Sequence, residues 1–315
     1  FIIPYAGIDL VNTNGTGFYI YGAGPEHGAR LVTLRESDPA AYETRMLYYK
    51  DLMGYLVPVN CEIPWEEGIA KATLKQMVSS EENDLQAARL GLLTALPEGL
   101  QVDMDIIGQT AKVSLSDECM KCVDAEEENA MVCAIVSALT EFDSIEEVQL
   151  LVDGEQVDHL THGTNVGAPL TRADLNIESV SADTDLNGSS AVQVFFESEA
   201  SGCMVPVTRT VFSNPDVDTA VLELLKGPKE DSGLAGCLPR GVGLISVKQK
   251  DGIVTINMSK EFKQVVDQAD GGAAAVKALV LTCSQFDGVK EVKLQVEGED
   301  FQLETETLAA TSVVN

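Results

Sequence analysis

The chain has 315 residues, of which 21 are lysine or arginine and 50 are aspartate or glutamate, so its formal net charge is −29 at pH 7. A surface this acidic repels phosphate backbones and anionic lipid headgroups, which argues against nucleic acid and membrane surfaces as partners. No apolar run of about 18 residues occurs, so no transmembrane helix is expected within this sequence. Solubility, a basic protein face and divalent cations are three open explanations of the acidity.

In the first half of the chain, apolar residues show no regular spacing at the start and a regular spacing further on. Residues 1–43 are rich in glycine and tyrosine and predict an irregular lead-in. Within 44–157, apolar spacing predicts a helix near 69–77 with a weak apolar face, a strand pair around Gly108, a second helix and a last strand. The supporting positions are Ile69, Ala72, Thr73, Gln76, Met77, Val102, Met104, Ile106, Ala111, Val113, Leu115, Val132, Ile135, Val136, Leu139, Phe142, Val148, Leu150 and Val152.

Residues 158–189 predict a linker. They are rich in glycine, threonine, asparagine and aspartate and show no helical period, with a short strand expected near 175–180. His159 and His162 lie three positions apart, a spacing that can share a metal ion when it falls on a helix. Because no helix is expected here, the segment is interpreted as an exposed polar linker without a metal site.

The second half gives clearer signals for the same kinds of element. VQVFFES at 192–198 and MVPVTRTV at 204–211 predict a hairpin, and Pro206 in its second strand favours a sheet edge or a bulge. Asn214-Pro215-Asp216 predicts a helix start, because it combines a capping residue, a proline and an acid. Gly227-Pro228 predicts the end of that helix.

The remainder of the second half predicts a tight hairpin, a helix and a final strand. Asp251-Gly252 between alternating apolar residues is a strong signal for the hairpin. A helix is expected near 276–286, and a strand near 292–296 has one apolar and one charged face. Residues 306–315 are assigned to a C-terminal tail.

The second half repeats the first. LVPV at 56–59 recurs as MVPV at 204–207, and EFDSIEEVQLLVDGE at 141–155 recurs as QFDGVKEVKLQVEGE at 285–299. Two copies of one domain are therefore predicted, copy one (44–157) and copy two (190–305). Each follows the order β-β-α-β-β-α-β, and the single apolar faces imply two helices packed on one face of a small mixed sheet, which is an α+β fold.

The cysteines are expected to be core residues and not redox or zinc-binding groups. Cys119 and Cys122 form a CxxC pair, a spacing that serves redox or zinc chemistry in other proteins. The equivalent positions of copy two are Phe262 and Val265, which are typical core residues. A cysteine in such a place acts as a small hydrophobe, so a structural role is expected for both thiols.

No catalytic constellation is apparent among the polar residues. Hydrolysis of a glycan would require two carboxylates on either side of the glycosidic bond. Asp143 and Asp287 recur before the last strand of each copy and Glu147 and Glu291 at its start, where turn and strand-edge roles account for them. The acid run over 124–128 is expected to be a solvated helix start and not a calcium loop.

The ordered set of motifs in each half resembles the GerMN domain family of sporulation and germination lipoproteins. Copy two carries MVPVTR at 204–209, ELLKGP at 223–228, LPRG at 238–241 and LVLTCSQFDGVKEVKLQVEG at 279–298. Copy one matches more loosely, because KQMVSS at 75–80 replaces the LLKGP element and Asn60-Cys61 replaces the Thr-Arg pair.

This resemblance implies an extracytoplasmic lipoprotein in the cell envelope of an endospore-forming bacterium, with a lipid anchor upstream of Phe1. It implies no enzyme activity and no cofactor, and it implies protein partners in the transenvelope complex between mother cell and forespore. A peptidoglycan (spore cortex)-directed binder or hydrolase is the alternative function. Self-association and a cation-dependent matrix protein are further alternatives.

The predicted binding site is the edge strand of copy two, with Val205, Pro206, Val207 and Arg209 as its residues. An unpaired strand edge can accept a strand from a partner, which is why this strand is chosen. For Arg209 the alternative is a surface ion pair within its own copy.

Overall fold

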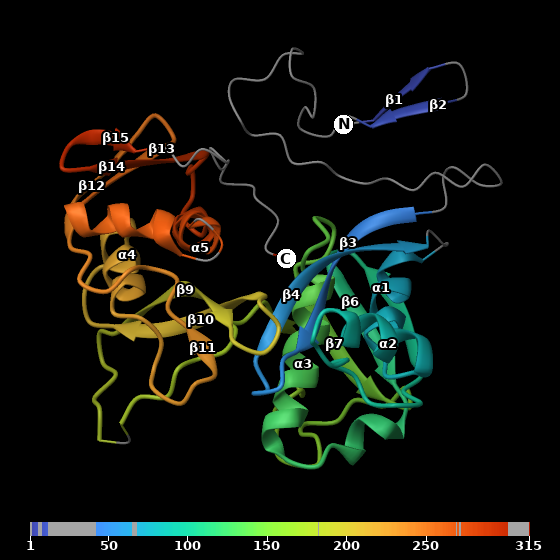
Figure 1. The fold of residues 1–315 in the computed structure, drawn as a ribbon. Coiled ribbons are helices and arrows are strands. Elements are labelled where there is room, and N and C mark those ends of the chain that lie inside the picture. Colours follow the sequence, from blue (N-terminus) through green and yellow to red (C-terminus); the bar gives the residue numbers. More distant parts are fainter. Residues whose placement is uncertain are drawn as a thin grey trace.

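The computed structural model describes residues 2–5, 8–11, 42–64, 68–181, 183–268, 270, 272–301 and 315 (Figure 1). Most of the lead-in predicted over 1–43 lies outside these residues. Its described part contains an antiparallel pair, β1 (Ile2–Tyr5) and β2 (Ile8–Val11). The predicted tail over 306–315 also lies outside them, apart from Asn315.

Copy one contains the predicted order of elements with three additions. Its first hairpin is β3 (Tyr42–Lys50) with β4 (Leu56–Pro64), and its four-stranded sheet has the order β5-β6-β7-β8, with β6 and β7 parallel. The additions are a helix after α1, a 3₁₀ helix and β8. The remaining elements are α1 (Ile69–Met77), α2 (Glu81–Arg89), β5 (Val102–Ile107), β6 (Thr110–Leu115), η1 (Asp117–Lys121), α3 (Ala125–Leu139), β7 (Glu147–Val152) and β8 (Leu170–Thr171).

Copy two repeats this plan. Its first hairpin, β9 (Ser190–Ser198) with β10 (Met204–Val211), is joined by the short β11 (Leu234–Ala235), and its four-stranded sheet has the order β12-β13-β14-β15. The remaining elements are α4 (Val217–Leu225), β12 (Leu244–Lys250), β13 (Ile253–Met258), η2 (Lys260–Asp267), α5 (Ala273–Ser284), β14 (Glu291–Val296) and β15 (Glu299–Phe301).

The local signals account for the ends of these elements in copy two. Asp216 is the N-cap of α4, and its side chain accepts a hydrogen bond from the backbone N–H of Thr219 at 2.9 Å. Gly227 follows the helix with a positive φ of 76°, a conformation that glycine adopts without strain. Asp251 and Gly252, with φ of 54° and 84°, form the two-residue turn between β12 and β13.

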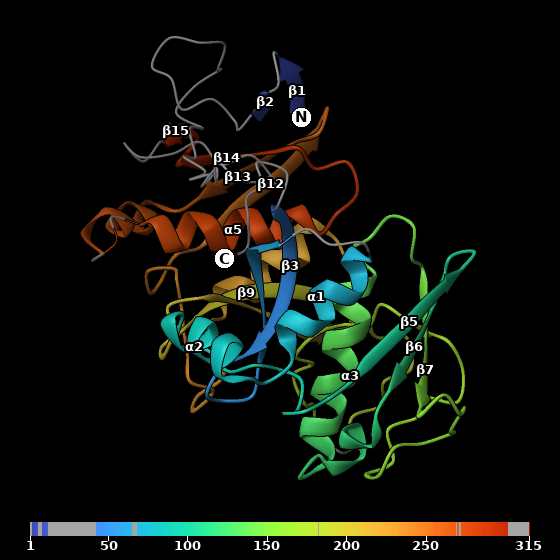
Figure 2. The same ribbon diagram turned by 90° about the vertical axis from the view of Figure 1, so that its right-hand side faces the viewer.

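The helices of each copy pack on one face of the four-stranded mixed sheet, as predicted, so the α+β fold class is confirmed (Figure 2). The first hairpin does not join that sheet. It covers the opposite side of the helices, with α1 and α3 contacting β3 in copy one and α4 and α5 contacting β9 in copy two. Each copy therefore has a helical layer between two sheets.

One continuous set of buried side chains runs through both copies. Tyr48, Phe196 and Phe262 are among its largest members, and each is at most 1% exposed. Burial of side chains of this size is the main favourable contribution to folding. Within the described ranges, no helix combines the length and apolar composition needed to cross a bilayer.

The linker is more ordered than its composition indicated. Leu160, Val166 and Leu175 are buried in the common core, β8 pairs with β7, and Ile177 forms an isolated parallel bridge to Thr208. The expected strand near 175–180 is thus reduced to a single bridge. The linker therefore packs against the rest of the protein through its buried residues. The expectation of an exposed linker holds only for its other residues.

Candidate functional site

The four residues predicted to receive a partner all lie in β10 and are all buried. The outer edge of β10 faces the linker and not solvent, because the Thr208 N–H donates to the Asn176 carbonyl and the Thr208 carbonyl accepts from the Glu178 N–H. A partner strand would have to displace these bonds. Binding of a partner at Val205, Pro206, Val207 and Arg209 stays a prediction, and each of them already has contacts within the chain.

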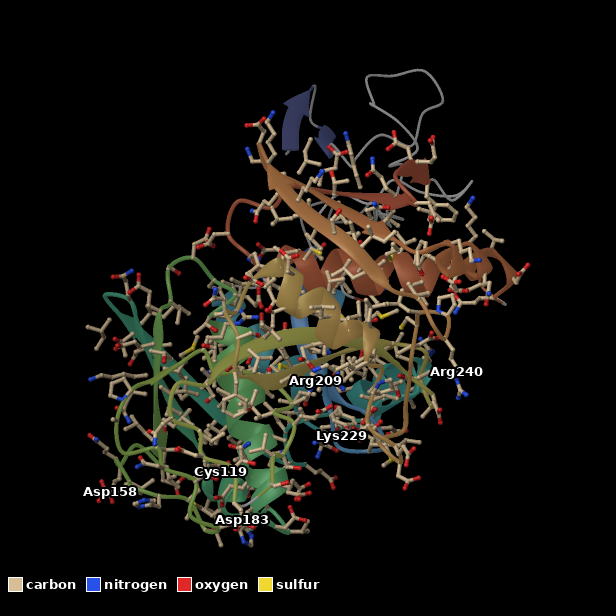
Figure 3. The ribbon with its side chains drawn as sticks, turned by 90° about the vertical axis from the view of Figure 1, so that its left-hand side faces the viewer. Cys119, Asp158, Asp183, Arg209, Lys229 and Arg240 are labelled. Atoms are coloured by element: carbon tan, nitrogen blue, oxygen red, sulfur yellow. The ribbon has the colours of Figure 1, made fainter. Side chains whose placement is uncertain are left out.

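Arg209, labelled in Figure 3, makes the most side-chain polar contacts of these four residues. Its side chain, 8% exposed, forms an ion pair with Glu178 of the linker at 3.0 Å, and its guanidinium lies 5.1 Å from the centre of the Phe196 ring. The guanidinium also donates to the carbonyl oxygens of Glu223 and Gly227, both at 2.7 Å. Arg209 thus satisfies carbonyl groups at the C-terminal end of α4 while it holds the linker. The alternative expected for Arg209, a surface ion pair within its own copy, is met only in part, because the pair with Glu223 at 3.8 Å is buried and the shorter pair is with the linker.

This geometry explains why two motifs are missing together from copy one. The arginine of the VPVTR strand requires a helix end such as LLKGP, because its donors are satisfied by carbonyls at that end. In copy one Cys61 stands at the equivalent position, and α1 ends at Met77 in an extended residue, Val78, that leads to α2. Without that helix end a buried arginine would lack acceptors, so the loss of one motif follows from the loss of the other.

A buried carboxylate anchors the start of the linker in copy one. Glu128 on α3 is fully buried, and its two oxygens accept from the backbone N–H groups of His162 at 2.8 Å and Thr164 at 3.0 Å. The His162 ring donates through Nε2 to the carbonyl of Cys122 at 2.7 Å. The interpretation of 124–128 as a solvated helix start therefore holds for Asp124, the N-cap of α3, but not for Glu128.

His159 and His162 do not form a metal site in this arrangement. The His162 ring is engaged with Cys122, and His159 is exposed in a turn where it bridges to Asn165. Across the residues that the structure describes, no group of three or more histidine, cysteine, aspartate or glutamate side chains could hold a metal ion.

A second polar contact holds the linker against the first hairpin of copy one. Arg172 donates to the hydroxyl of Tyr48 at 2.9 Å and forms an ion pair with Glu141 at 2.6 Å, and the Tyr48 hydroxyl donates to the same carboxylate at 2.7 Å. Burial is the main cause that raises the pKa of Tyr48 far above its usual value, so this hydroxyl stays protonated and donates. The contact is structural, because all three groups are occupied by each other.

The CxxC thiols lie in the core, as their equivalence to Phe262 and Val265 indicated. Cys119 is 0% and Cys122 7% exposed, and burial raises their pKa values to about 12 and about 11. The thiolate is the reactive form of cysteine, and almost none of it is present near neutral pH. All seven cysteines of the chain are unpaired.

This burial predicts the order in which the thiols react. In native protein at pH 8, iodoacetamide should modify Cys119, Cys122, Cys237 and Cys283 at least about 100-fold more slowly than in denaturant, because these groups are buried protonated thiols. The half-buried Cys203 should react first. Peptide mass spectrometry over time measures the order, and labelling of Cys119 as fast as Cys203 would restore a redox role for the CxxC pair.

The recurring acids occupy equivalent places in the two copies. Asp143 and Asp287 are exposed in turns at the same place in each copy. Glu147 accepts a long hydrogen bond from Thr110 at 3.5 Å, and Glu291 forms an ion pair with Lys293 at 3.6 Å. These places agree with the turn and strand-edge roles that the sequence indicated.

Each four-stranded sheet has one long outer strand whose outer edge has no partner strand among the described residues, and its other outer strand is short. The long outer strands are β5 in copy one and β12 in copy two. On β5 the exposed side chains include Ile107 at 60%, together with Asp103 and Asp105, whereas on β12 they include Ile245 at 52%, Lys248 and Lys250. The edge of copy one is acidic and the edge of copy two is basic.

A shallow hollow of about 540 Å³ lies between α4 and the start of β12. Its lining includes Leu222, Leu225, Val242, Leu244, Glu223 and Lys226. Apolar walls with a few charged groups at the rim suit the side chain of a docked segment better than a reacting substrate. The ELLKGP motif supplies Glu223, Leu225 and Lys226, but the sequence did not show that residues 242–244, about 20 positions downstream, lie against them.

Comparisons with known proteins agree with this arrangement. A family profile described as Germane, sporulation and spore germination, matches residues 46–158 and 193–302. The spore germination protein GerM of Bacillus subtilis (strain 168) is 29% identical over 277 residues, which cover 85% of this chain and 75% of that protein. The solved structure of the tandem GerMN domains of the sporulation protein GerM from Bacillus subtilis has a TM-score of 0.75 and 28% identity, and the match covers 87% of this chain and 99% of that one.

The two matched stretches fall on the two copies, and together they span more than half of the chain. The structural match extends over both copies at once, so the tandem arrangement is shared as well as the single domain. The chain carries two GerMN domains in tandem and therefore belongs to the Germane family of sporulation and spore germination proteins.

Proposed function

We propose that this protein is a non-catalytic assembly protein of the cell envelope, held by a lipid anchor, that supports the transenvelope complex between mother cell and forespore. The family and the similarity to a spore germination protein give the process. An assembly role is supported because the well-connected polar side chains make structural contacts with the linker and do not form a reaction centre. Glu128, Arg172 and Arg209 are all occupied in holding the linker, while the outer edges of β5 and β12 have no partner strand among the described residues.

The edge of β12 is the contact surface that we propose for the protein partner. A partner segment that adds a strand to this edge would gain backbone hydrogen bonds, and it could place an apolar side chain in the hollow beside Leu222 and Leu244. Lys248 and Lys250 favour an acidic segment. This surface replaces the edge of β10 in the proposal, because β10 is already engaged with the linker.

An exposed apolar residue on this edge provides the test. Ile245→Asp should reduce the capture of channel components from sporulating cells by at least about tenfold, because it puts a carboxylate at the centre of the contact. Leu186→Asp is the matched control, since Leu186 is 50% exposed in the linker against 52% for Ile245. Crosslinking in cells followed by quantitative mass spectrometry measures the capture.

Two results would contradict the proposal. Equal capture of the same channel components by wild type and I245D would remove β12 as the contact. Release of muropeptides from purified spore-cortex peptidoglycan by the wild-type protein would show a hydrolase and end the non-catalytic role.

A further inference from the structure

The VPV strands of the two copies lie side by side where the copies meet. Val57 of β4 and Val205 of β10 are both 0% exposed, although each lies on a strand that its own sheet leaves unpaired on one side. β4 and β10 belong to different sheets, so they do not form a regular ladder with each other. They contact each other through the common core, and the hydrogen bonds that bridge them come from side chains elsewhere in the chain.

Asn176 makes the first of these contacts. Its Oδ1 accepts from the Leu56 N–H at 2.8 Å, and its Nδ2 donates to the Leu56 carbonyl at 2.8 Å. The second hydrogen of the same amide donates to the Pro206 carbonyl at 2.7 Å. One side chain thus satisfies both backbone groups of a residue in copy one and one backbone group of copy two.

Asn315 makes the same set of contacts with the copies exchanged. Its Oδ1 accepts from the Met204 N–H at 2.7 Å, and its Nδ2 donates to the Met204 carbonyl at 2.8 Å and to the Pro58 carbonyl at 2.9 Å. Figure 1 shows the C-terminal end at this position, beside β4 and between the copies.

The two sets of bonds are related by an internal two-fold axis. Met204 and Pro206 are the residues of copy two that align with Leu56 and Pro58 in the LVPV and MVPV motifs. The backbone bonds of the two asparagines correspond in the same way. The Asn176 carbonyl accepts from the Thr208 N–H at 3.3 Å, and the Asn315 carbonyl accepts from the N–H of the equivalent residue, Asn60, at 3.1 Å. Asn176 and Asn315 are therefore equivalent residues, although neither belongs to a repeated sequence motif.

The prolines explain why an amide is needed at these places. Pro58 and Pro206 have no N–H group, so the strand that carries each of them cannot complete a ladder at that point. Each buried proline carbonyl still needs a donor, since an unsatisfied buried polar group costs about 1–3 kcal/mol. An asparagine side chain offers one acceptor and two donors in a plane, which matches the N–H and two carbonyls that it meets.

We infer that the VPV strand of each copy is a docking surface for the other copy, and that Asn176 and Asn315 form a two-fold amide clamp that closes it. The occupant of the β10 edge is thus part of the same chain. The clamp holds the two copies in one orientation, so the tandem behaves as a single body. Ser198 and Asp51, which are hydrogen-bonded at 3.1 Å and both 1% exposed, add a contact outside the symmetry.

Substitution of the asparagines in the full chain tests the clamp. Asn176→Asp and Asn315→Asp keep the shape but replace two donors by an acceptor that faces two carbonyl oxygens, so they should loosen the interface more than alanine does. Asn187→Ala is the control, because Asn187 is an exposed linker asparagine whose backbone bond to Asp185 survives the change. Small-angle X-ray scattering should show an increased maximum dimension for N176D/N315D and no change for N187A.

Hydrogen exchange at single amides separates a clamp from a general loss of stability. N176A should speed exchange of the Leu56 amide at least about tenfold and leave Met204 protected, and N315A should do the reverse. This reciprocal pattern is readable even if the double variant fails to fold. Unchanged scattering for N176D/N315D, or exchange that rises equally at both amides in each single variant, would overturn the clamp.

Discussion

Replacing Arg209 by methionine is expected to lower the free energy of unfolding by about 3–5 kcal/mol, because it leaves a partly buried carboxylate and two carbonyl groups without their cation. Glu178 would keep only Lys229, at 3.5 Å, and the end of α4 would lose two hydrogen bonds. Urea unfolding followed by circular dichroism measures the change.

The matched control is Arg240→Met. Arg240 is an exposed arginine of the same copy, at the periphery of the molecule in Figure 3, and its loss should change the free energy of unfolding by no more than about 0.5 kcal/mol. In a double-mutant cycle, Glu178→Gln with R209M should cost less than the two single changes added together. Equal stability of R209M and R240M would show that the guanidinium contributes only a surface ion pair.

The elements of the fold could be predicted where their signals are local. The start of α4 at Asp216, its end at Gly227 and the turn at Asp251-Gly252 each depend on residues that lie next to one another in the sequence. The internal repeat then extended these assignments to copy one, where the periodicity is weaker. Helix α2 was missed because copy two, whose signals were clearer, has no helix between α4 and β12, although Ser80 before Glu81 and Glu82 is a helix-start signal.

The surroundings of β10 could not be predicted in the same way. Its proline correctly indicated a strand on the edge of its sheet, but the sequence does not show what covers that edge. The contacts of Arg209 come from Glu178, 31 positions upstream, and from the carbonyls of Glu223 and Gly227 downstream. The one available signal was the joint loss of Thr-Arg and LLKGP in copy one, which indicates that the arginine and the helix end are in contact.

Glu128→Gln should cost about 2–3 kcal/mol at pH 7, because glutamine keeps one acceptor oxygen and turns an amide group toward a backbone N–H that needs an acceptor. The His162 and Thr164 amides should then exchange faster with solvent. Glu126→Gln is the matched control, since Glu126 is exposed on the first turn of the same helix. Unfolding in urea and hydrogen exchange of both variants at pH 7 measure the difference.

The pH dependence of this loss follows from the direction of the pKa shift. Burial acts to raise the pKa of Glu128, but the hydrogen bonds from the His162 and Thr164 N–H groups outweigh it, and the pKa lies below the usual value. A carboxyl whose folded-state pKa is lowered contributes its full stability above the unfolded value of about 4.3 and loses it as the pH falls through the folded value. The stability gap between wild type and E128Q should therefore be constant from pH 7 to about 5 and shrink below about pH 4. A gap that stays constant down to pH 3 would mean that the buried carboxyl binds its two N–H groups equally well when protonated, and that packing alone accounts for the cost of the substitution.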